Sequence, residues 1–79
     1  GAIDKILAKM RNNPRDWRIE DLEVVARRLG LAVRSPGGSH VVFSLPAGAG
    51  ELSVPAHRPI KPIYVKKFVA MVEPLAQEE

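Results

Sequence analysis

The sequence has no cysteine, only two histidines and few aromatic residues, which make up 5% of the chain. Without cysteine the chain forms neither disulfides nor zinc–thiolate sites, and this composition is typical of a cytoplasmic protein. No apolar run approaches the roughly 20 residues that a membrane-spanning helix needs. No secretory signal is evident. We therefore expect a cytoplasmic protein that has no membrane partner.

The length of 79 residues predicts one domain with a single modest core. A chain of this size buries only about 60% of its unfolded surface, which leaves little room for a deep cofactor site. With 46% hydrophobic and 27% charged residues, the composition is that of a globular protein rather than a disordered one. We expect no small-molecule cofactor.

The net charge is only +3, but its distribution along the chain is uneven. Between residues 27 and 67 a single acid, Glu51, faces seven basic residues: Arg27, Arg28, Arg34, Arg58, Lys61, Lys66 and Lys67. A basic middle is the electrostatic pattern expected for a polyanion partner such as nucleic acid. A solvated surface that keeps the protein soluble would have the same composition, so charge alone leaves both interpretations open.

Apolar residues at helical spacing predict three helices, over residues 3–10, 19–29 and from about residue 62. Gly30 is placed to end the second helix in a left-handed conformation, and Pro62 suits the first turn of the third. Pro74 lacks an amide hydrogen, so the third helix is expected to fray or end there. Residues 77–79 form a polar tail, and Trp17 is expected to pack against the core.

Between the second and third helices the apolar period changes to two, which predicts strands over residues 31–35, 41–45 and 52–54. The turns between them, 36–38 and 46–50, are rich in proline and glycine. Such short turns predict a three-stranded antiparallel meander. Its flanking helices should cover one face of the sheet and leave the other open. The fold class is therefore α+β, in the order α-α-β-β-β-α.

The register of the first hairpin follows from placing apolar residues on one face. This rule pairs Val33 with Val41 and Leu31 with Phe43, across a three-residue loop over 36–38. Arg34 then lies opposite His40 on the open face.

The same rule pairs Leu45 with Leu52 and Phe43 with Val54 in the second hairpin. Continued past Pro55, this register brings His57 close to His40. The sequence thus predicts an imidazole between Arg34 and the segment His57-Arg58.

Few kinds of chemistry fit so small a set of reactive residues. Two histidines are too few ligands for a zinc site, and no phosphate-binding glycine motif is present. Ser39 and His40 are adjacent in a strand, so their side chains should point to opposite faces and form no hydrolase pair. Cleavage of RNA requires less, because the ribose 2′-OH supplies the nucleophile and the protein adds an acid–base group and cations. The alternative is that His40 and His57 are merely exposed polar residues.

Five short pieces of the chain together resemble the HicA (YcfA-like) toxin family. They are Leu29-Gly30-Leu31, Gly38-Ser39-His40, Phe43, Ser53-Val54-Pro55-Ala56-His57 and the helix entry Lys61-Pro62. The resemblance covers residues 19–73. The resemblance implies that residues 1–79 are a single HicA-like domain in which residues 1–14 form an N-terminal helical extension. Many members carry a second histidine directly after the first, where this chain has Val41.

The resemblance implies a fold like that of double-stranded-RNA-binding domains (dsRBD-like). It also implies an mRNA interferase, a metal-independent endoribonuclease that acts in the stress response as the toxin of a type II toxin–antitoxin system. Its partners would be mRNA and a HicB-type antitoxin protein. His40 takes the place of the catalytic histidine. The expected RNA-binding residues are Arg34, Gly37, Gly38, Ser39, His57, Arg58, Lys61 and Lys66.

Two alternatives of other classes are compatible with the same residues. The chain could be an RNA-binding module without catalysis, which would show salt-sensitive binding to duplex RNA and no cleavage. It could also be a degenerate toxin whose remaining role is to bind an antitoxin.

Overall fold

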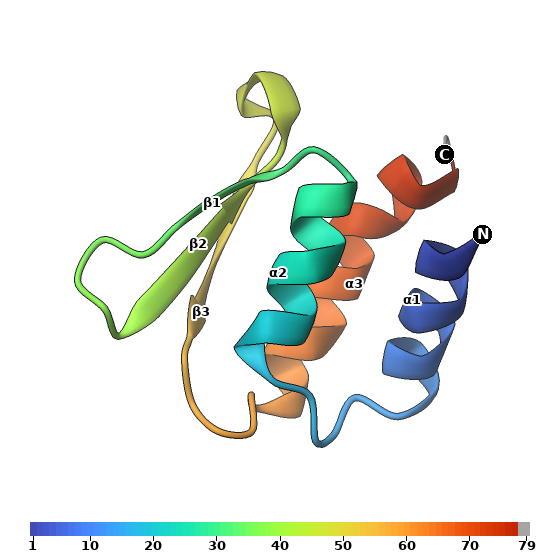
Figure 1. Cartoon of the computed structure of the whole chain (residues 1–79), viewed down its shortest axis with the longest axis horizontal. Helices are drawn as coiled ribbons and strands as arrows, with labels where there is room; N and C mark the ends of the chain where they lie inside the picture. Colours follow the sequence, from blue (N-terminus) through green and yellow to red (C-terminus); the bar gives the residue numbers. More distant parts are fainter. Residues whose placement is uncertain (78–79) are drawn as a thin grey trace.

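Residues 1–77, which a computed structural model describes, form helices and an antiparallel sheet in the predicted order (Figure 1). The elements are α1 (Ala2–Asn12), α2 (Ile19–Arg28), β1 (Ala32–Arg34), β2 (His40–Ser44), β3 (Glu51–Pro55) and α3 (Pro62–Gln77). A single 3₁₀ turn, Pro46–Gly48, lies between β2 and β3. The predicted α+β class is confirmed, and the expected tail at Glu78 and Glu79 lies outside the described residues.

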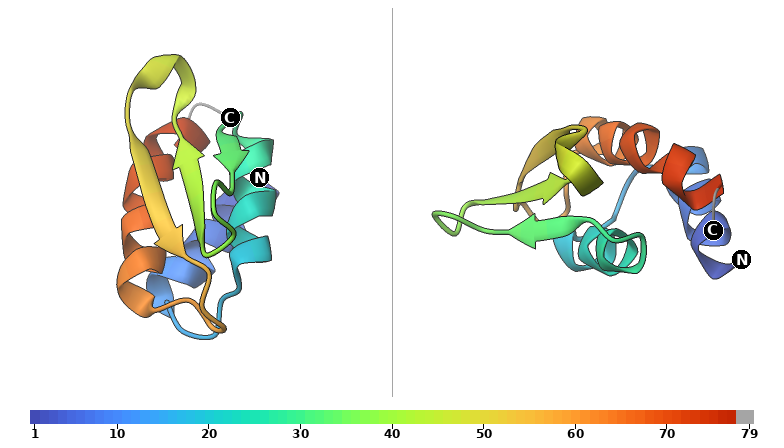
Figure 2. Two further views of the ribbon diagram at one scale, coloured as in Figure 1. Left: turned by 90° about the vertical axis from the view of Figure 1, so that its left-hand side faces the viewer. Right: turned by 90° about the horizontal axis from the view of Figure 1, so that it is seen from above.

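The sheet and the helices form successive layers. The strand order is β1-β2-β3, and the helices stand behind the sheet when its outer face is viewed (Figure 2). Helices α2 and α3 lie next to the sheet, and α1 lies beyond them against α3 (Figures 1 and 2). One face of the sheet is therefore open, as the amphipathic pattern predicts, and the order from α2 to α3 is the α-β-β-β-α order of a dsRBD-like fold.

The core is built where β2 meets α3. Phe43 and Phe68 are both fully buried, and their rings meet edge to face with centroids 5.1 Å apart. Three buried residues at helical spacing on α1 join the same core: Ile3, Leu7 and Met10. Trp17 packs against it as predicted. Helix α1 therefore packs into the domain core, although the family resemblance implied that residues 1–14 are an extension.

The sequence predicts the end of α2 correctly but not the end of α3. Gly30 has a φ of +84°, the left-handed conformation that the sequence predicts after α2. The expectation that α3 ends at Pro74 is wrong, because the helix continues to Gln77. Pro74 has no N–H to donate to the carbonyl of Ala70, four residues earlier in the helix. Both residues are exposed, so water can donate a hydrogen bond to this carbonyl instead. Burial of Ala76 holds the last turn in place.

The register of the first hairpin differs from the prediction by two residues. Val33 pairs with Phe43, and Arg34 pairs with Val42 rather than with His40. A shift of two residues keeps every side chain on its face, so apolar alternation cannot distinguish the two registers. The connection is consequently longer than the predicted three-residue loop and runs over residues 35–39.

The second hairpin is shifted in the same way. Phe43 pairs with Leu52, and His40 pairs with Pro55. The pairing that would have brought His57 opposite His40 is therefore wrong. The loop closes through a hydrogen bond of 2.8 Å from the Leu45 N–H to the Gly50 carbonyl, next to the 3₁₀ turn. This hydrogen bond fixes the register of β2 with β3, and the alternation of apolar residues in the strands does not predict it.

Candidate functional site

The open face of the sheet carries the polar side chains of the strands. His40, Val42 and Ser44 of β2 share this face with Arg34 of β1 and with the paired residues of β3. His40 lies at the start of β2 and is exposed, while Val41 and Phe43, the next residues on the other face, are buried. The side on which His40 lies is thus the predicted one, although its cross-strand neighbour is not.

Three hydrogen bonds hold the segment around His40. The Ser39 hydroxyl lies 3.2 Å from Nδ1 of the His40 ring. The Ser35 hydroxyl donates to the His40 carbonyl at 3.1 Å, and the Ala56 N–H donates to the Ser39 carbonyl at 3.0 Å. The prediction that the Ser39 and His40 side chains point to opposite faces is wrong, because Ser39 precedes β2 and strand alternation does not apply to it. The ring therefore has its Nδ1 engaged.

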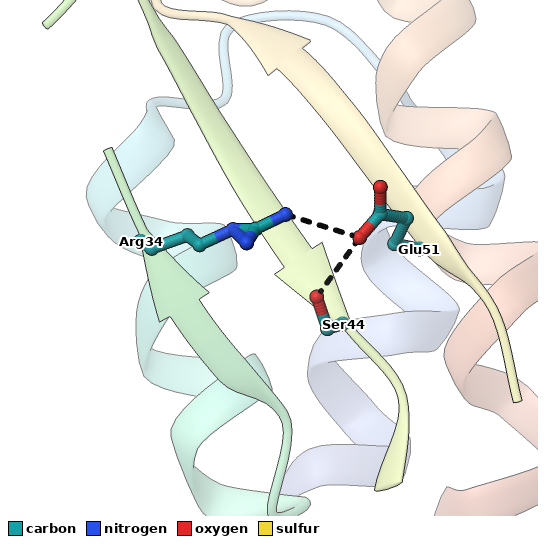
Figure 3. Close-up of polar contacts among 3 residues, drawn as sticks. All are labelled: Arg34, Ser44 and Glu51. Atoms are coloured by element: carbon teal, nitrogen blue, oxygen red, sulfur yellow. Dashed lines mark hydrogen bonds and ion pairs between the residues drawn. The ribbon is translucent and has the colours of Figure 1, made fainter. Parts of the chain in front are cut away.

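Arg34 contacts an acid instead of lying beside His40. Its guanidinium crosses β2 and forms an ion pair of 3.2 Å with Glu51 of β3, whose carboxylate also accepts from the Ser44 hydroxyl at 3.4 Å (Figure 3). Val42, directly opposite Arg34, is only 9% exposed although it lies on the open face, in keeping with cover by the arginine stem. Part of the positive charge expected at His40 is therefore neutralised by Glu51.

The glycine pair before His40 forms the exposed tip of the β1–β2 loop. Figure 1 shows this loop projecting from the sheet, away from the helices. Gly38 has a φ of +82°, whereas Gly37 does not lie in the left-handed region, and a Cβ at either position would meet nothing within 4 Å. The two neighbours therefore differ in backbone conformation alone.

This difference gives a matched pair of variants. We expect Gly38→Ala to lower the free energy of unfolding by about 1–2 kcal/mol, the cost of a left-handed conformation for a residue with a Cβ. Gly37→Ala should leave it unchanged or raise it slightly, because alanine restricts the unfolded chain. Urea denaturation followed by Trp17 fluorescence measures both. Equal effects of the two substitutions would contradict the observed loop conformation.

The segment between β3 and α3 brings His57 and two cations to the same end of the sheet as His40. His57 and Lys61 are exposed. The guanidinium of Arg58, 76% exposed, lies 3.7 Å from the carboxylate of Glu20 in the first turn of α2. Because Ala56 is bonded to Ser39, this loop begins beside His40 and runs from there along the lower edge of the molecule in Figure 1.

Lys66 is not brought to this end of the sheet. It lies on the side of α3 that faces α1, where it borders a hollow with Arg11 and Glu73. Arg11 and Glu73 form an ion pair of 2.9 Å. Of the eight predicted RNA-binding residues, Lys66 is therefore the one placed on a different surface from His40.

Two residues near the site were not among those predicted from the sequence. Ser35 bonds the His40 carbonyl, and Arg18 borders a hollow with Arg58 and Asp16. Ser35 could have been predicted, because a serine next to a Pro-Gly-Gly turn often forms a side-chain hydrogen bond to the backbone. No pattern in the sequence near Arg18 predicts its position beside Arg58. The segment before α2 and the β3–α3 loop are brought together by a hydrogen bond of 2.9 Å from the Ile60 N–H to the Trp17 carbonyl, a contact between distant parts of the chain.

No helix within residues 1–77 is long and apolar enough to cross a membrane. Comparisons with protein-family models, with curated proteins and with solved structures find no match to this chain.

Proposed function

We propose that this protein is a metal-independent endoribonuclease of the HicA type, with His40 as its general acid or base. One observation carries the proposal: an exposed imidazole on an open sheet face whose Nδ1 lies 3.2 Å from the Ser39 hydroxyl. A histidine held at one nitrogen and open at the other is arranged for proton transfer. The sequence resemblance supports the same residue.

The proposed reaction needs no group beyond the RNA and the side chains. His40 takes the proton of a ribose 2′-OH, and the 2′ oxygen attacks the adjacent phosphorus. The bond from phosphorus to the 5′ oxygen breaks, and that oxygen receives a proton from the imidazolium or from water. The products are a 2′,3′-cyclic phosphate and a 5′-OH.

Positive charge for the phosphate would come from the β3–α3 loop rather than from Arg34. Arg58 and Lys61 are exposed at the end of the sheet where His40 lies. Arg58 lies 3.7 Å from Glu20, whereas Arg34 is hydrogen-bonded to Glu51 at 3.2 Å and is therefore held more firmly. Positioned cations stabilise the additional charge of the transition state. Gly37 and Gly38 keep the neighbouring loop free of side chains, so the RNA backbone can approach it closely. In the cell the partners would be mRNA and a HicB-type antitoxin, in the cytoplasm.

The experiment uses an RNA in which one nucleotide lacks its 2′-OH. We expect the purified chain to cleave the unmodified RNA in the presence of EDTA and to leave 2′,3′-cyclic phosphate ends. A single 2′-deoxynucleotide 5′ of a preferred cleavage position should abolish cleavage there and nowhere else. Cleavage at the substituted position would contradict the mechanism. Binding of RNA without any cleavage would favour the non-catalytic RNA-binding module.

A further inference from the structure

The connector between α1 and α2 borders an open cleft that the proposed cleavage site does not use. The cleft has a volume of about 450 Å³ and contains Trp17, the single tryptophan of the chain. It is lined in part by the segment that precedes α2, which runs along the lower edge of the molecule in Figure 1. We call it the Trp17 cleft.

Trp17 is held so that part of its ring lines the cleft. The indole packs against the core, and its Nε1 donates a hydrogen bond of 2.7 Å to the Asn13 carbonyl. The side chain is nevertheless only partly buried. A fixed indole with an accessible part is a surface on which a nucleobase can stack, and such stacking contributes about 1–3 kcal/mol per base.

The polar lining of the cleft suits a neutral ligand. Lys9 and Arg15 balance the charges of Asp16 and Asp21. The Asp21 carboxylate already accepts a hydrogen bond of 2.9 Å from the Arg18 N–H at the start of α2. The amides of Asn12 and Asn13 add further donors and acceptors. An uncharged heterocycle rich in donors and acceptors fits this lining better than a polyphosphate does.

A basic path connects the Trp17 cleft with His40. The neighbouring hollow shares Asp16 with the cleft and is lined by Arg18 and Arg58. The loop that borders it begins at Ala56, bonded to Ser39, and reaches Ile60, bonded to Trp17. Four peptide steps span at most about 14 Å. The backbone at Ala56, next to Ser39, and the backbone at Ile60, next to Trp17, are thus no farther apart than the length of a few nucleotides.

We propose that the Trp17 cleft is a nucleobase subsite for single-stranded RNA. The strand passes Arg18 and Arg58 with its phosphates and places one base on Trp17, a few nucleotides from the phosphodiester at His40. The inference rests on the proposed function for the choice of RNA as ligand. It assigns to α1 and its connector a role in the selection of the substrate.

Trp17 itself reports on the binding. A His40→Ala protein, which leaves the RNA intact, is titrated with a short single-stranded oligoadenylate, with 5′-AMP and with ribose 5-phosphate. We expect saturable quenching of Trp17 fluorescence by the oligoadenylate and by AMP, and none by ribose 5-phosphate at the same concentration. Quenching by ribose 5-phosphate to the same extent, or no quenching by any of the three, would overturn the subsite.

Two arginines of α2 and its connector provide a matched comparison. Arg18 borders the hollow that adjoins the cleft, and Arg28 lies exposed at the far end of α2. Arg18→Ala should weaken oligoadenylate binding severalfold and lower the slope of log K against log salt by about 1. Arg28→Ala should leave both unchanged. Equal behaviour of the two variants would contradict the proposed path of the strand.

The outcomes separate this inference from the proposed function. Base-dependent quenching of the His40→Ala protein, together with no RNA cleavage by the wild-type chain, would overturn the ribonuclease proposal and support the subsite. Cleavage of RNA without any change in Trp17 fluorescence would support the ribonuclease and overturn the subsite.

Discussion

His40→Ala is expected to slow RNA cleavage by a factor of about 10²–10⁴, the usual contribution of general acid–base catalysis. The fold should tolerate the change, because His40 is exposed at the start of β2 and its backbone bonds do not depend on the ring. The rate is measured with a labelled RNA in the presence of EDTA, and circular dichroism checks the fold. Equal rates for the variant and the wild type would exclude His40 as the catalytic group.

His57→Ala and Ser39→Ala serve as comparisons for this prediction. His57 lies beyond the last paired residue of β3, so its loss should weaken RNA binding more than it slows the chemical step. In the proposed mechanism Ser39 is a positioning residue: its hydroxyl lies 3.2 Å from Nδ1, and if Nδ1–H donates to it, Nε2 is free to accept a proton. One hydrogen bond of this kind is expected to contribute about two- to tenfold in rate.

Nuclear magnetic resonance separates the role of Ser39 from a general loss of structure. Long-range ¹H–¹⁵N spectra should show less of the Nδ1–H tautomer of His40 in Ser39→Ala, while the tautomers of His57 stay as in the wild type. Ser39→Thr, which keeps the hydroxyl, should restore both the tautomer and the rate. An unchanged His40 tautomer in Ser39→Ala would contradict the positioning role.

Phe43→Ala is expected to have the largest effect on stability, a loss of about 3–5 kcal/mol in the free energy of unfolding. The ring is fully buried on the core face of β2, three residues from His40, and meets Phe68 edge to face at 5.1 Å. Its removal leaves a cavity between the sheet and α3. Domains of this kind have only about 5–15 kcal/mol of stability in total. The variant should therefore be partly or fully unfolded at 37 °C.

Guanidinium denaturation, followed by Trp17 fluorescence, measures this loss. Val24→Ala is the control, because Val24 lies on α2 with 62% of its surface exposed and should change the stability by no more than about 0.5 kcal/mol. A loss below about 1 kcal/mol in Phe43→Ala would show that Phe43 does not face the core. His40, whose face is set by the same alternation, would then not lie on the open face.

The elements and their faces could be predicted from the sequence because local periodicity encodes them. The apolar stripe of α2 predicts its buried residues, and the assignment of Val41 and Phe43 to the core face places His40 on the open face. Gly30 predicts the end of α2 correctly. The end of α3 was predicted wrongly, because burial of Ala76 outweighs the local preference of Pro74.

The neighbours of His40 could not be predicted, because they depend on register and on contacts between distant segments. A shift of two residues preserves every face, so alternation cannot choose between Arg34 opposite His40 and Arg34 opposite Val42. The observed register comes with the longer loop over residues 35–39, in which the Ser35 hydroxyl donates to the His40 carbonyl. The ion pair of Arg34 with Glu51 follows from this register.

The sequence by itself therefore determined the α+β class, the element order and the open face on which His40 lies. Only the tertiary structure decided which groups surround the imidazole: Ser39 at Nδ1, the β3–α3 loop beside it, and Arg34 held away by Glu51. The physical reason is one of range. Periodicity records which side of an element is buried, whereas register and loop contacts depend on energies summed over the whole fold.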